Sequence, residues 1–293
     1  MSLVNRIVIV LVAFIAVLLL AVLALTRDLP AAKVLGEEKF AQRDNAQLQY
    51  FVSGPANGEA VVLQASYARS GADFNQLSAT LAAAGYRTVI MQARGVDDSS
   101  LPSYDLTLFD YADDLEAVLQ AEGLDAPVAL VGHAFGNRII RAYAARYPER
   151  VRALALLAAG DGSPPDEVRD AIGRVLMTGL PASVRQPAAQ LAFFAPGNTV
   201  PDSWVQGWYP RAGFAQGRAV AALDAEQWIH AGGVDMLVVQ PEQDAAAADG
   251  AAKLRQRFPA QVTIASVANA GHALLPEQPA AVARIVLQYL ASR

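Results

Sequence analysis

The sequence predicts an α/β protein in which a mostly parallel sheet has helices on both faces, with a helical cap insertion and an N-terminal transmembrane helix. Short apolar runs typical of buried strands alternate with amphipathic segments of helical period, and the connections between them are short. The 293 residues suffice for one large domain with a sizeable core. Residues 7–25 are an uninterrupted apolar stretch, which predicts the membrane helix.

The apolar stretch has the length of a membrane span, because about 19 residues rising about 1.5 Å each match the hydrocarbon core of a bilayer. A cleavable signal peptide has a shorter apolar region and a clear cleavage site, and residues 21–26 offer only a poor one. We therefore expect an uncleaved single-pass anchor. Arg6 precedes the span, whereas Arg27 is offset by Asp28, which favours a bacterial inner-membrane protein with a periplasmic domain.

These patterns divide the chain into an anchor over residues 1–28, a polar tether over 29–44 and a globular domain over 45–293. Residues from about 161 to 233 interrupt the strand–helix alternation, are rich in proline and hold all three tryptophans. We expect them to form a helical cap over the strand ends. The expected strands are residues 47–52, 60–64, 86–91, 128–131, 151–157, 235–240 and 261–267, with helices over 74–84, 106–121, 139–144, 246–258 and 279–290.

Composition excludes several classes of function. The formal net charge of −5 leaves no basic surface for nucleic acid. The chain has no cysteine, so it forms no disulfide and offers neither a thiolate nucleophile nor a cysteine metal site. His133, His230 and His272 are too scattered in the sequence to suggest a metal cluster. We therefore expect no metal and no cofactor.

Residues 127–136 carry the strongest local pattern in the chain. A short apolar run ends at Gly132, and Gly136 precedes a helical stripe of apolar side chains. This is the layout of a nucleophile elbow of the form G-x-S-x-G, in which a tight strand-to-helix turn presents one hydroxyl above the sheet. The central position here is Ala134, so the turn is present without its serine.

Several motifs occur in one order along the chain. After the elbow at residues 132–136, the strand 237–240 runs into Asp244, and residues 270–279 place His272 before a Pro-Glu-x-Pro helix start. Residues 94–99 also match an R-G-x-G-x-S loop, with Asp97 in place of the second glycine. In these motifs the chain resembles the α/β-hydrolase superfamily, and its esterases and lactonases in particular, from about residue 47 to its end.

The resemblance implies a role for each of these residues. His272 stands where the family has its general base, and Asp244 where it has the carboxylate that orients the base, with Asp161 as the alternative acid. The oxyanion hole would be the backbone N–H groups of Phe135 and Tyr67.

Two further histidines have ordinary structural explanations. Strand alternation turns His133 away from position 134, so we expect it to be structural, and we expect His230 to lie at the surface of the insertion.

Ala134 leaves three interpretations open. An alanine methyl cannot form an acyl-enzyme, which closes the two-step serine mechanism at this position. Either His272 and Asp244 activate water or a substrate proton directly, or the nucleophile is displaced to Ser66, or the protein is a catalytically inactive pseudo-hydrolase that binds a ligand or another protein. The retained acid and histidine favour chemistry on a small ester- or acyl-type substrate.

The insertion is the expected specificity element. We predict that Trp204, Trp208 and Tyr209 bind an apolar substrate in a cleft over the elbow, as cap residues of the family do. Two alternatives remain: the aromatic side chains form the small core of the insertion itself, or they form a patch that faces the bilayer. The aromatic residues concerned are Phe193, Phe194, Trp204, Trp208, Tyr209 and Phe214.

Overall fold

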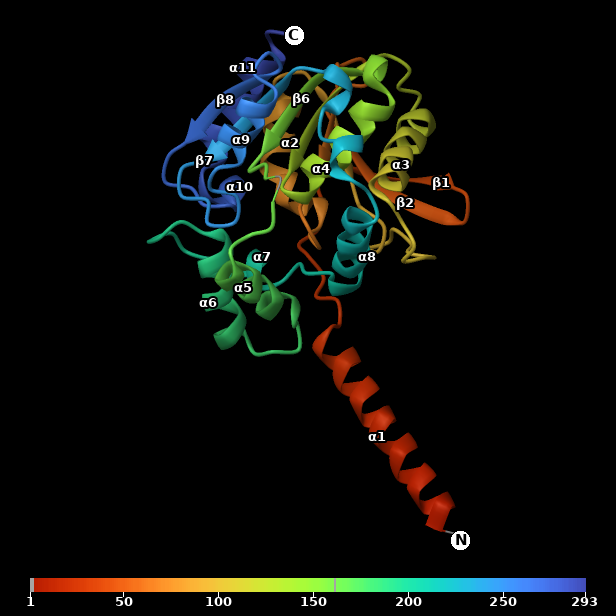
Figure 1. The fold of residues 1–293 in the computed structure, drawn as a ribbon. Helices are drawn as coiled ribbons and strands as arrows, with labels where there is room; N and C mark the ends of the chain where they lie inside the picture. Colours follow the sequence, from red (N-terminus) through yellow and green to blue (C-terminus); the bar gives the residue numbers. More distant parts are fainter. Residues whose placement is uncertain (1–2, 161) are drawn as a thin grey trace.

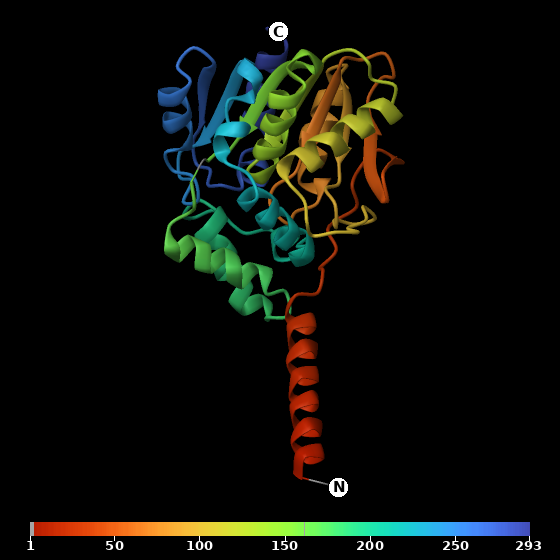
Figure 2. The ribbon, with the colours of Figure 1, turned by 45° about the vertical axis from the view of Figure 1, so that its right-hand side comes forward.

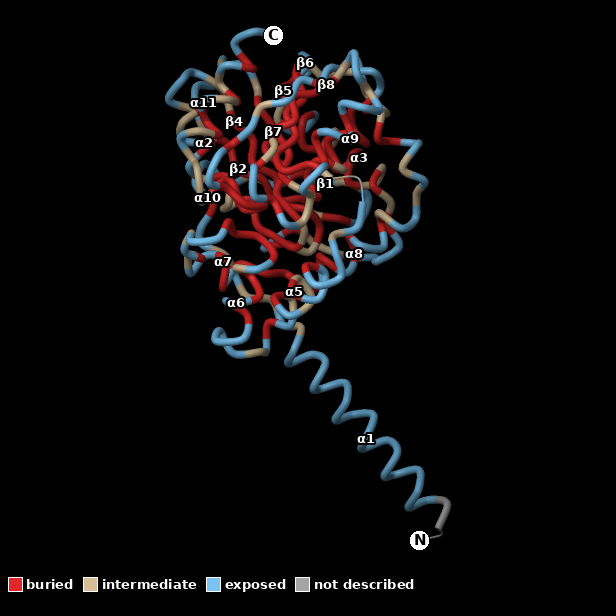
Figure 3. The backbone as a smooth tube through the Cα atoms, turned by 60° about the vertical axis from the view of Figure 1, so that its left-hand side comes forward, coloured by how far each residue is buried: buried red, intermediate tan, exposed pale blue. Residues whose placement is uncertain are grey.

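The computed structural model describes residues 3–160 and 162–293. Helix α1 (Leu3–Leu25) stands away from a globular body that holds the rest of the chain (Figure 1). Within α1, residues Asn5–Leu25 are long and apolar enough to cross a membrane, and none of their most apolar window is buried against the protein. The helix is exposed along its length, whereas buried residues concentrate around the sheet (Figure 3). A helix that is apolar on all sides is typical of a membrane span or of a signal sequence.

In the described part of the chain, eight strands form one sheet in the order β1-β2-β4-β3-β5-β6-β7-β8. The pairs β1–β2 and β2–β4 are antiparallel and the others are parallel, which confirms the predicted mostly parallel sheet. The strands are β1 (Glu37–Arg43), β2 (Ala46–Ser53), β3 (Ala60–Gln64), β4 (Arg87–Met91), β5 (Val128–His133), β6 (Val151–Leu157), β7 (Met236–Pro241) and β8 (Val262–Val267).

Helices cover both faces of the sheet, as predicted. Helices α3, α4 and α9 bury their apolar sides in one core cluster, and α2 and α11 bury theirs in a second cluster on the opposite face. These helices are α2 (Asn75–Ala83), α3 (Leu108–Ala121), α4 (Phe135–Arg146), α9 (Gly250–Arg257) and α11 (Pro279–Leu290). The short helix α10 (Leu274–Glu277) and four 3-10 turns, at Gly71–Phe74, Pro148–Arg150, Ala225–Gln227 and Ala231–Gly233, complete the body.

The segment predicted to be a tether contains a strand. Residues 29–44 were expected to be irregular, whereas Glu37–Arg43 pairs along its whole length with β2 as the edge of the sheet. Only Ala41 of this strand is buried. An edge strand with one solvated face carries charged side chains, so the apolar pattern that identifies inner strands is missing here.

The insertion forms a helical cap, as predicted, between the sheet and the end of α1 (Figure 2). Its helices are α5 (Asp166–Leu176), α6 (Ala182–Phe193), α7 (Asp202–Val205) and α8 (Pro210–Ala221). Most of its buried apolar side chains form a third core cluster that is separate from the two clusters on the sheet. The cap therefore has its own packing and roofs the carboxyl ends of the parallel strands.

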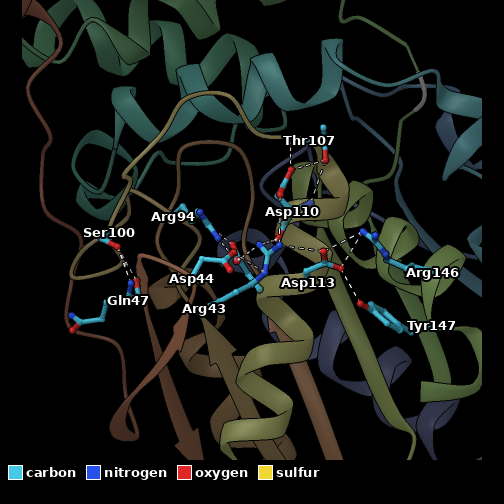
Figure 4. A network of polar contacts seen from close by, with 11 residues as sticks. Arg43, Asp44, Gln47, Arg94, Ser100, Thr107, Asp110, Asp113, Arg146 and Tyr147 are labelled. Atoms are coloured by element: carbon cyan, nitrogen blue, oxygen red, sulfur yellow. Dashed lines mark hydrogen bonds and ion pairs between the residues drawn. The ribbon is translucent and has the colours of Figure 1, made fainter.

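A polar network joins the β1–β2 hairpin to α3 (Figure 4). Arg43 at the end of β1 forms ion pairs with Asp113, at 3.2 Å, and with Asp114, at 3.1 Å. Arg94 reaches the same Asp114 through two hydrogen bonds of 2.6 Å. Thr107 caps the start of α3 in a reciprocal capping box with Asp110. These contacts fix the loop after β4 to the edge of the sheet.

Candidate active site

The turn from β5 to α4 has the backbone of a nucleophile elbow. Ala134 has φ 49° and ψ −107°, a conformation that costs an L-residue about 1–3 kcal/mol. Its N–H donates to the carbonyl of Leu157 at 3.0 Å. The two glycines allow the close approach: a Cβ on Gly132 would lie 2.6 Å from the carbonyl carbon of Gly136, and one on Gly136 would lie 2.2 Å from the carbonyl oxygen of Gln64. The strained turn is thus kept around an alanine.

Asp244 and His272 form a buried pair. Asp244 follows β7, and its Oδ1 and Oδ2 lie 3.0 and 3.1 Å from Nδ1 of His272. Oδ1 also accepts the N–H groups of Ala246 and Ala247, each at 2.9 Å. Burial by itself raises the pKa of Asp244, but His272 and these two N–H groups outweigh burial and hold the pKa below its usual value. The carboxylate is therefore ionised and orients the imidazole.

The loop that carries His272 is fixed by contacts on three sides. The Nε2–H of His133 donates to the carbonyl of His272 at 2.7 Å, because a carbonyl can only accept. The N–H of Gly271 donates to Glu277 at 2.7 Å, and the N–H of Ala273 donates to the cap carbonyl of Phe193 at 2.8 Å. The imidazole of His272 thus has a defined position relative to both the elbow and the cap.

His133 is a structural histidine, as its place in the strand predicts. It is fully buried at the end of β5, and its Nδ1 has no hydrogen-bond partner among the described residues. Burial first, and then the proximity of His272, lower the pKa of His133 to about 4. A neutral ring that donates through Nε2 fits this site.

The two predicted oxyanion donors both lie beside the elbow. Phe135 is the first residue of α4 and Tyr67 lies in the loop after β3. In residues 3–160 and 162–293, no hydrogen bond occupies the N–H of either residue. The neighbouring N–H of Ala68 donates to the buried side chain of Gln216 on α8 at 2.7 Å, so a cap residue holds this loop. Two backbone donors are therefore open to a ligand.

A cavity of about 450 Å³ opens between the elbow and the cap. It brings together Ser66, Tyr67, Ala134, Phe135 and His272, five of the residues singled out from the sequence. Most of its other lining residues are small or apolar, two are arginines, and they come mainly from the cap and from the segments after β6 and β7. They include Ala158, Gly160, Ile172, Gly173, Leu176, Phe193, Gly217, Val220, Ala246 and Ala247, with Arg138 and Arg169 among them.

The aromatic residues predicted to bind substrate lie elsewhere, so that prediction is wrong. Trp204 and Trp208 are 2% and 1% exposed, stack around Phe193 and enclose the guanidinium of Arg69, and neither lines the cavity. They form the core of the insertion, which was the alternative. Tyr209 also lies outside the cavity.

The hydroxyl of Tyr209 joins separate loops. It accepts the N–H of Ala31 at 3.0 Å and donates to Asp97. Residue type alone cannot distinguish an aromatic side chain that packs from one that lines a cavity, because both are apolar.

The other residues singled out from the sequence lie outside the cavity or outside the described residues. The alternative acid Asp161 lies outside the described residues. His230 is half-buried, and its Nδ1 accepts the N–H of Gly232 at 3.0 Å, a turn contact. No group of histidine, aspartate and glutamate that could hold a metal occurs in the described part of the chain. Gln216 and Glu277 support the site and were not found from the sequence, because their contacts join segments that are far apart.

A model of the α/β-hydrolase fold family matches residues 59–194, which include the elbow and the oxyanion loop. The chain has the α/β-hydrolase fold. Among solved α/β-hydrolase structures, a bacterial membrane phospholipase A is 18% identical with a TM-score of 0.72, covering 99% of this chain and 97% of that one. Carboxylesterase CesB from Bacillus subtilis is 19% identical with a TM-score of 0.70, covering 92% and 95%.

A curated relative matches over a shorter stretch of this chain. The cis-3-alkyl-4-alkyloxetan-2-one decarboxylase of Shewanella oneidensis is 44% identical over 70 residues, or 24% of this chain. The match spans 21% of that relative's length.

Proposed function

We propose that this α/β-hydrolase acts on a small ester- or acyl-type substrate, with His272 and Asp244 as base and orienting acid and the N–H groups of Tyr67 and Phe135 as oxyanion hole. The observation that carries the proposal is the contact of the Asp244 carboxylate with Nδ1 of His272, whose ring lines the cavity beside Ala134. A buried carboxylate held under an imidazole is what base catalysis requires, whereas a binding pocket has no need of it.

The proposed reaction uses water as the nucleophile. Alanine is one oxygen atom smaller than serine, which leaves room for a water molecule between Ala134 and His272. His272 takes a proton from this water as its oxygen bonds to the substrate carbonyl carbon, and the resulting oxyanion accepts the two N–H groups. The C–O bond to the leaving group then breaks, and His272 returns the proton to the departing alkoxide. The products are a carboxylic acid and an alcohol.

The proposed substrate class agrees with the relatives named above. A phospholipase A and a carboxylesterase share the fold, and an oxetan-2-one is a cyclic ester. The cavity is lined mainly by small and apolar side chains, which suits an acyl chain or a small lactone more than a charged polymer. Short activated esters, lactones and thioesters are therefore the panel to test.

The decisive variant is His272→Ala, with His230→Ala as its matched control. We expect the wild type to hydrolyse at least one member of the panel, His272→Ala to abolish that turnover and His230→Ala to leave it unchanged. An unaffected rate in folded His272→Ala would remove the general-base role. Ala134→Ser should add turnover of short activated esters through an acyl-enzyme. An inert, well-folded Ala134→Ser would contradict the proposal that His272 and Asp244 are still placed to activate a serine at this position.

Ala134 itself favours a second candidate, a pseudo-hydrolase that binds a ligand or a partner protein. A wild type that is silent on the whole panel but binds an acyl ligand would support this candidate. Ser66 lines the cavity and is the remaining alternative nucleophile. A fluorophosphonate probe separates these cases. If it labels the wild type but not Ser66→Ala, Ser66 is the nucleophile. If it does not label the wild type, the site either activates water or only binds a ligand.

We also propose that α1 anchors the protein as an uncleaved, single-pass span with the domain on the periplasmic side of a bacterial inner membrane. Support comes from the length and apolar surface of α1 and from the charges that flank it. Alkaline phosphatase fused to the C-terminus should be active in cells, since that enzyme needs an oxidising compartment. An inactive fusion would show the opposite orientation, and a shortened chain in the soluble fraction would show that the span is cleaved off.

A further inference from the structure

The end of the anchor helix is joined directly to the cap. The N–H of Gly179 donates to the carbonyl of Leu25 at 3.2 Å, and the hydroxyl of Thr178 donates to the carbonyl of Arg27. A Cβ on Gly179 would lie 2.4 Å from the carbonyl oxygen of Ala24, so the two backbones touch. The loop between α5 and α6 is thus held at the last turn of the apolar helix.

A second contact prevents the cap from swinging away from the anchor. Leu29 and Trp208 exchange backbone hydrogen bonds of 2.9 and 3.0 Å, and Trp208 is buried in the core of the cap. Only a few residues separate this bridge from the end of α1. The height of the cap above the end of the span is therefore fixed by hydrogen bonds.

The cap segment beside this junction, residues 177–201, has no exposed charged side chain. Residues 177–201 contain one charged side chain, Arg185, which is 3% exposed. In the same segment Met177, Val184 and Leu191 are 46%, 39% and 39% exposed. Val184 and Leu191 are seven residues apart on α6, which places them on one face of the helix.

We propose that this face of the cap, here called the cap tip and made of Met177, Leu180, Val184 and Leu191, docks on the lipid bilayer beside the anchor. The inference rests on the proposed anchoring by α1. Leu25 ends the apolar span, so the loop bonded to it lies at the boundary between lipid tails and head groups. An uncharged apolar surface at that depth gains free energy by contact with lipid.

Docking would also connect the cavity with the membrane. Ile172, Gly173 and Leu176 of α5 line the cavity, and Met177 follows directly in the cap tip. A ligand dissolved in the bilayer would meet the wall of the cavity within one helical turn of the lipid surface. The cap tip would thus favour lipophilic substrates that arrive from the membrane.

The test uses the full chain, which has no cysteine and so accepts single labels. Met177→Cys, Val184→Cys, Leu19→Cys and Ser292→Cys each carry a bimane, and the protein is placed in nanodiscs of phosphatidylcholine with or without brominated tails. Leu19 lies within α1, and Ser292 lies at the C-terminus, on the opposite end of the body (Figure 1). Brominated tails should quench the labels at 19, 177 and 184 by roughly twofold or more and leave the label at 292 unchanged.

The outcomes separate the steps of the inference. If the label at 19 is quenched but the labels at 177 and 184 are not, like the label at 292, docking is overturned and the anchor is kept. No quenching at 19 would overturn both the anchor and the docking that depends on it. Failure of ester hydrolysis would leave the quenching pattern unaffected, so the enzymatic proposal is tested separately.

A charge variant provides a second readout. Leu180→Glu with Val184→Glu should roughly halve the quenching of the label at 177, because carboxylates are costly below the head groups. Leu180→Gln with Val184→Gln is the matched control with a smaller effect. Both positions are at least partly exposed, so the fold should be retained, which circular dichroism checks. Unchanged quenching in the glutamate variant would contradict lipid contact at the cap tip.

Discussion

Two buried carboxylates of this protein have the same exposure and different partners. Asp114 on α3 and Asp244 after β7 are each 3% exposed. Asp114 is paired with two arginines, whereas Asp244 is paired with a histidine and two backbone N–H groups. Burial alone would lower the pKa of Arg94, but Asp114 raises it overall, so this partner stays charged.

The difference teaches how the same buried charge can serve structure or chemistry. A guanidinium never gives up its proton in neutral solution, so the Asp114 pairs hold β1 and α3 together and cannot move a proton. An imidazole is the side chain that both accepts and releases protons there. The comparison leads to four predictions, from the largest expected effect to the smallest.

Asp244→Asn should lower kcat/KM for a hydrolysed ester by about 10⁴-fold, because the amide no longer stabilises a protonated imidazole in the required orientation. The measurement is steady-state hydrolysis by the purified full chain. Asp249→Asn, on a neighbouring exposed residue, is the control with unchanged kinetics. A loss of less than tenfold in folded Asp244→Asn would show that the pair does not act in the reaction.

Asp114→Asn should reduce the free energy of unfolding by about 3–5 kcal/mol, since it leaves the buried charge of Arg94 without its carboxylate. Urea denaturation in a mild detergent measures the loss. The turnover of the molecules that remain folded should not change. Asp105→Asn, whose side chain is 98% exposed, is the control, and an equally small effect in both variants would contradict a structural role for the network.

His133 should make the protein less stable in acid. Its pKa is about 4 in the folded protein against an ordinary value of 6.5, so the unfolded chain binds the proton first as the pH falls. Its contribution is fully present above about pH 6.5 and is lost towards pH 4, a loss of roughly 3 kcal/mol. Asp244, whose pKa is lowered, adds a loss in the same direction as the pH falls.

The control for this pH dependence is His133→Gln, whose amide can still donate to the carbonyl of His272 but does not titrate. Urea denaturation between pH 4 and pH 7 should show a shallower fall in stability for the variant than for the wild type. Parallel curves for the two proteins would refute the contribution of His133.

Arg146→Met should lower the free energy of unfolding least, by under about 1 kcal/mol. The arginine pairs with Asp113 at 3.1 Å, but its side chain is 44% exposed, so water screens the pair. The same urea measurement applies. A loss of more than about 2 kcal/mol would mean that the outer pairs are coupled to the buried ones and that the network acts as one unit.

The sequence predicted the inner part of the fold closely. The strands at Ala60–Gln64 and Val151–Leu157 and the closing helix Pro279–Leu290 have their predicted bounds, because continuous apolar runs and a proline start mark them. Strand β1 was missed, since an edge strand with charged residues lacks that signal. A local apolar pattern therefore identifies strands that are buried on both faces of the sheet and helices that bury one side.

The site was only partly accessible to the same reasoning. Motifs identified the elbow and the pair of Asp244 with His272, which the structure brings into contact, while their roles in catalysis stay proposals. Gln216 holds Ala68, and Glu277 holds Ala195 of the cap, across long separations in the sequence, so no local pattern marks these two contacts. Trp204 and Trp208 show the opposite failure, in which a local pattern is present but misleads. Their apolar character predicted that they line the cavity, whereas they pack in the core of the cap.

The contact between the cap and the histidine loop has a consequence for motion. The N–H of Ala273 donates to Phe193, and Glu277 accepts the N–H groups of both Gly271 and Ala195. An outward movement of α6 would break the bonds of Ala273 with Phe193 and of Ala195 with Glu277 at once. The amides of residues 195 and 273 should then exchange with deuterium at a common rate, and ligand entry through the cap would displace the imidazole on the same timescale.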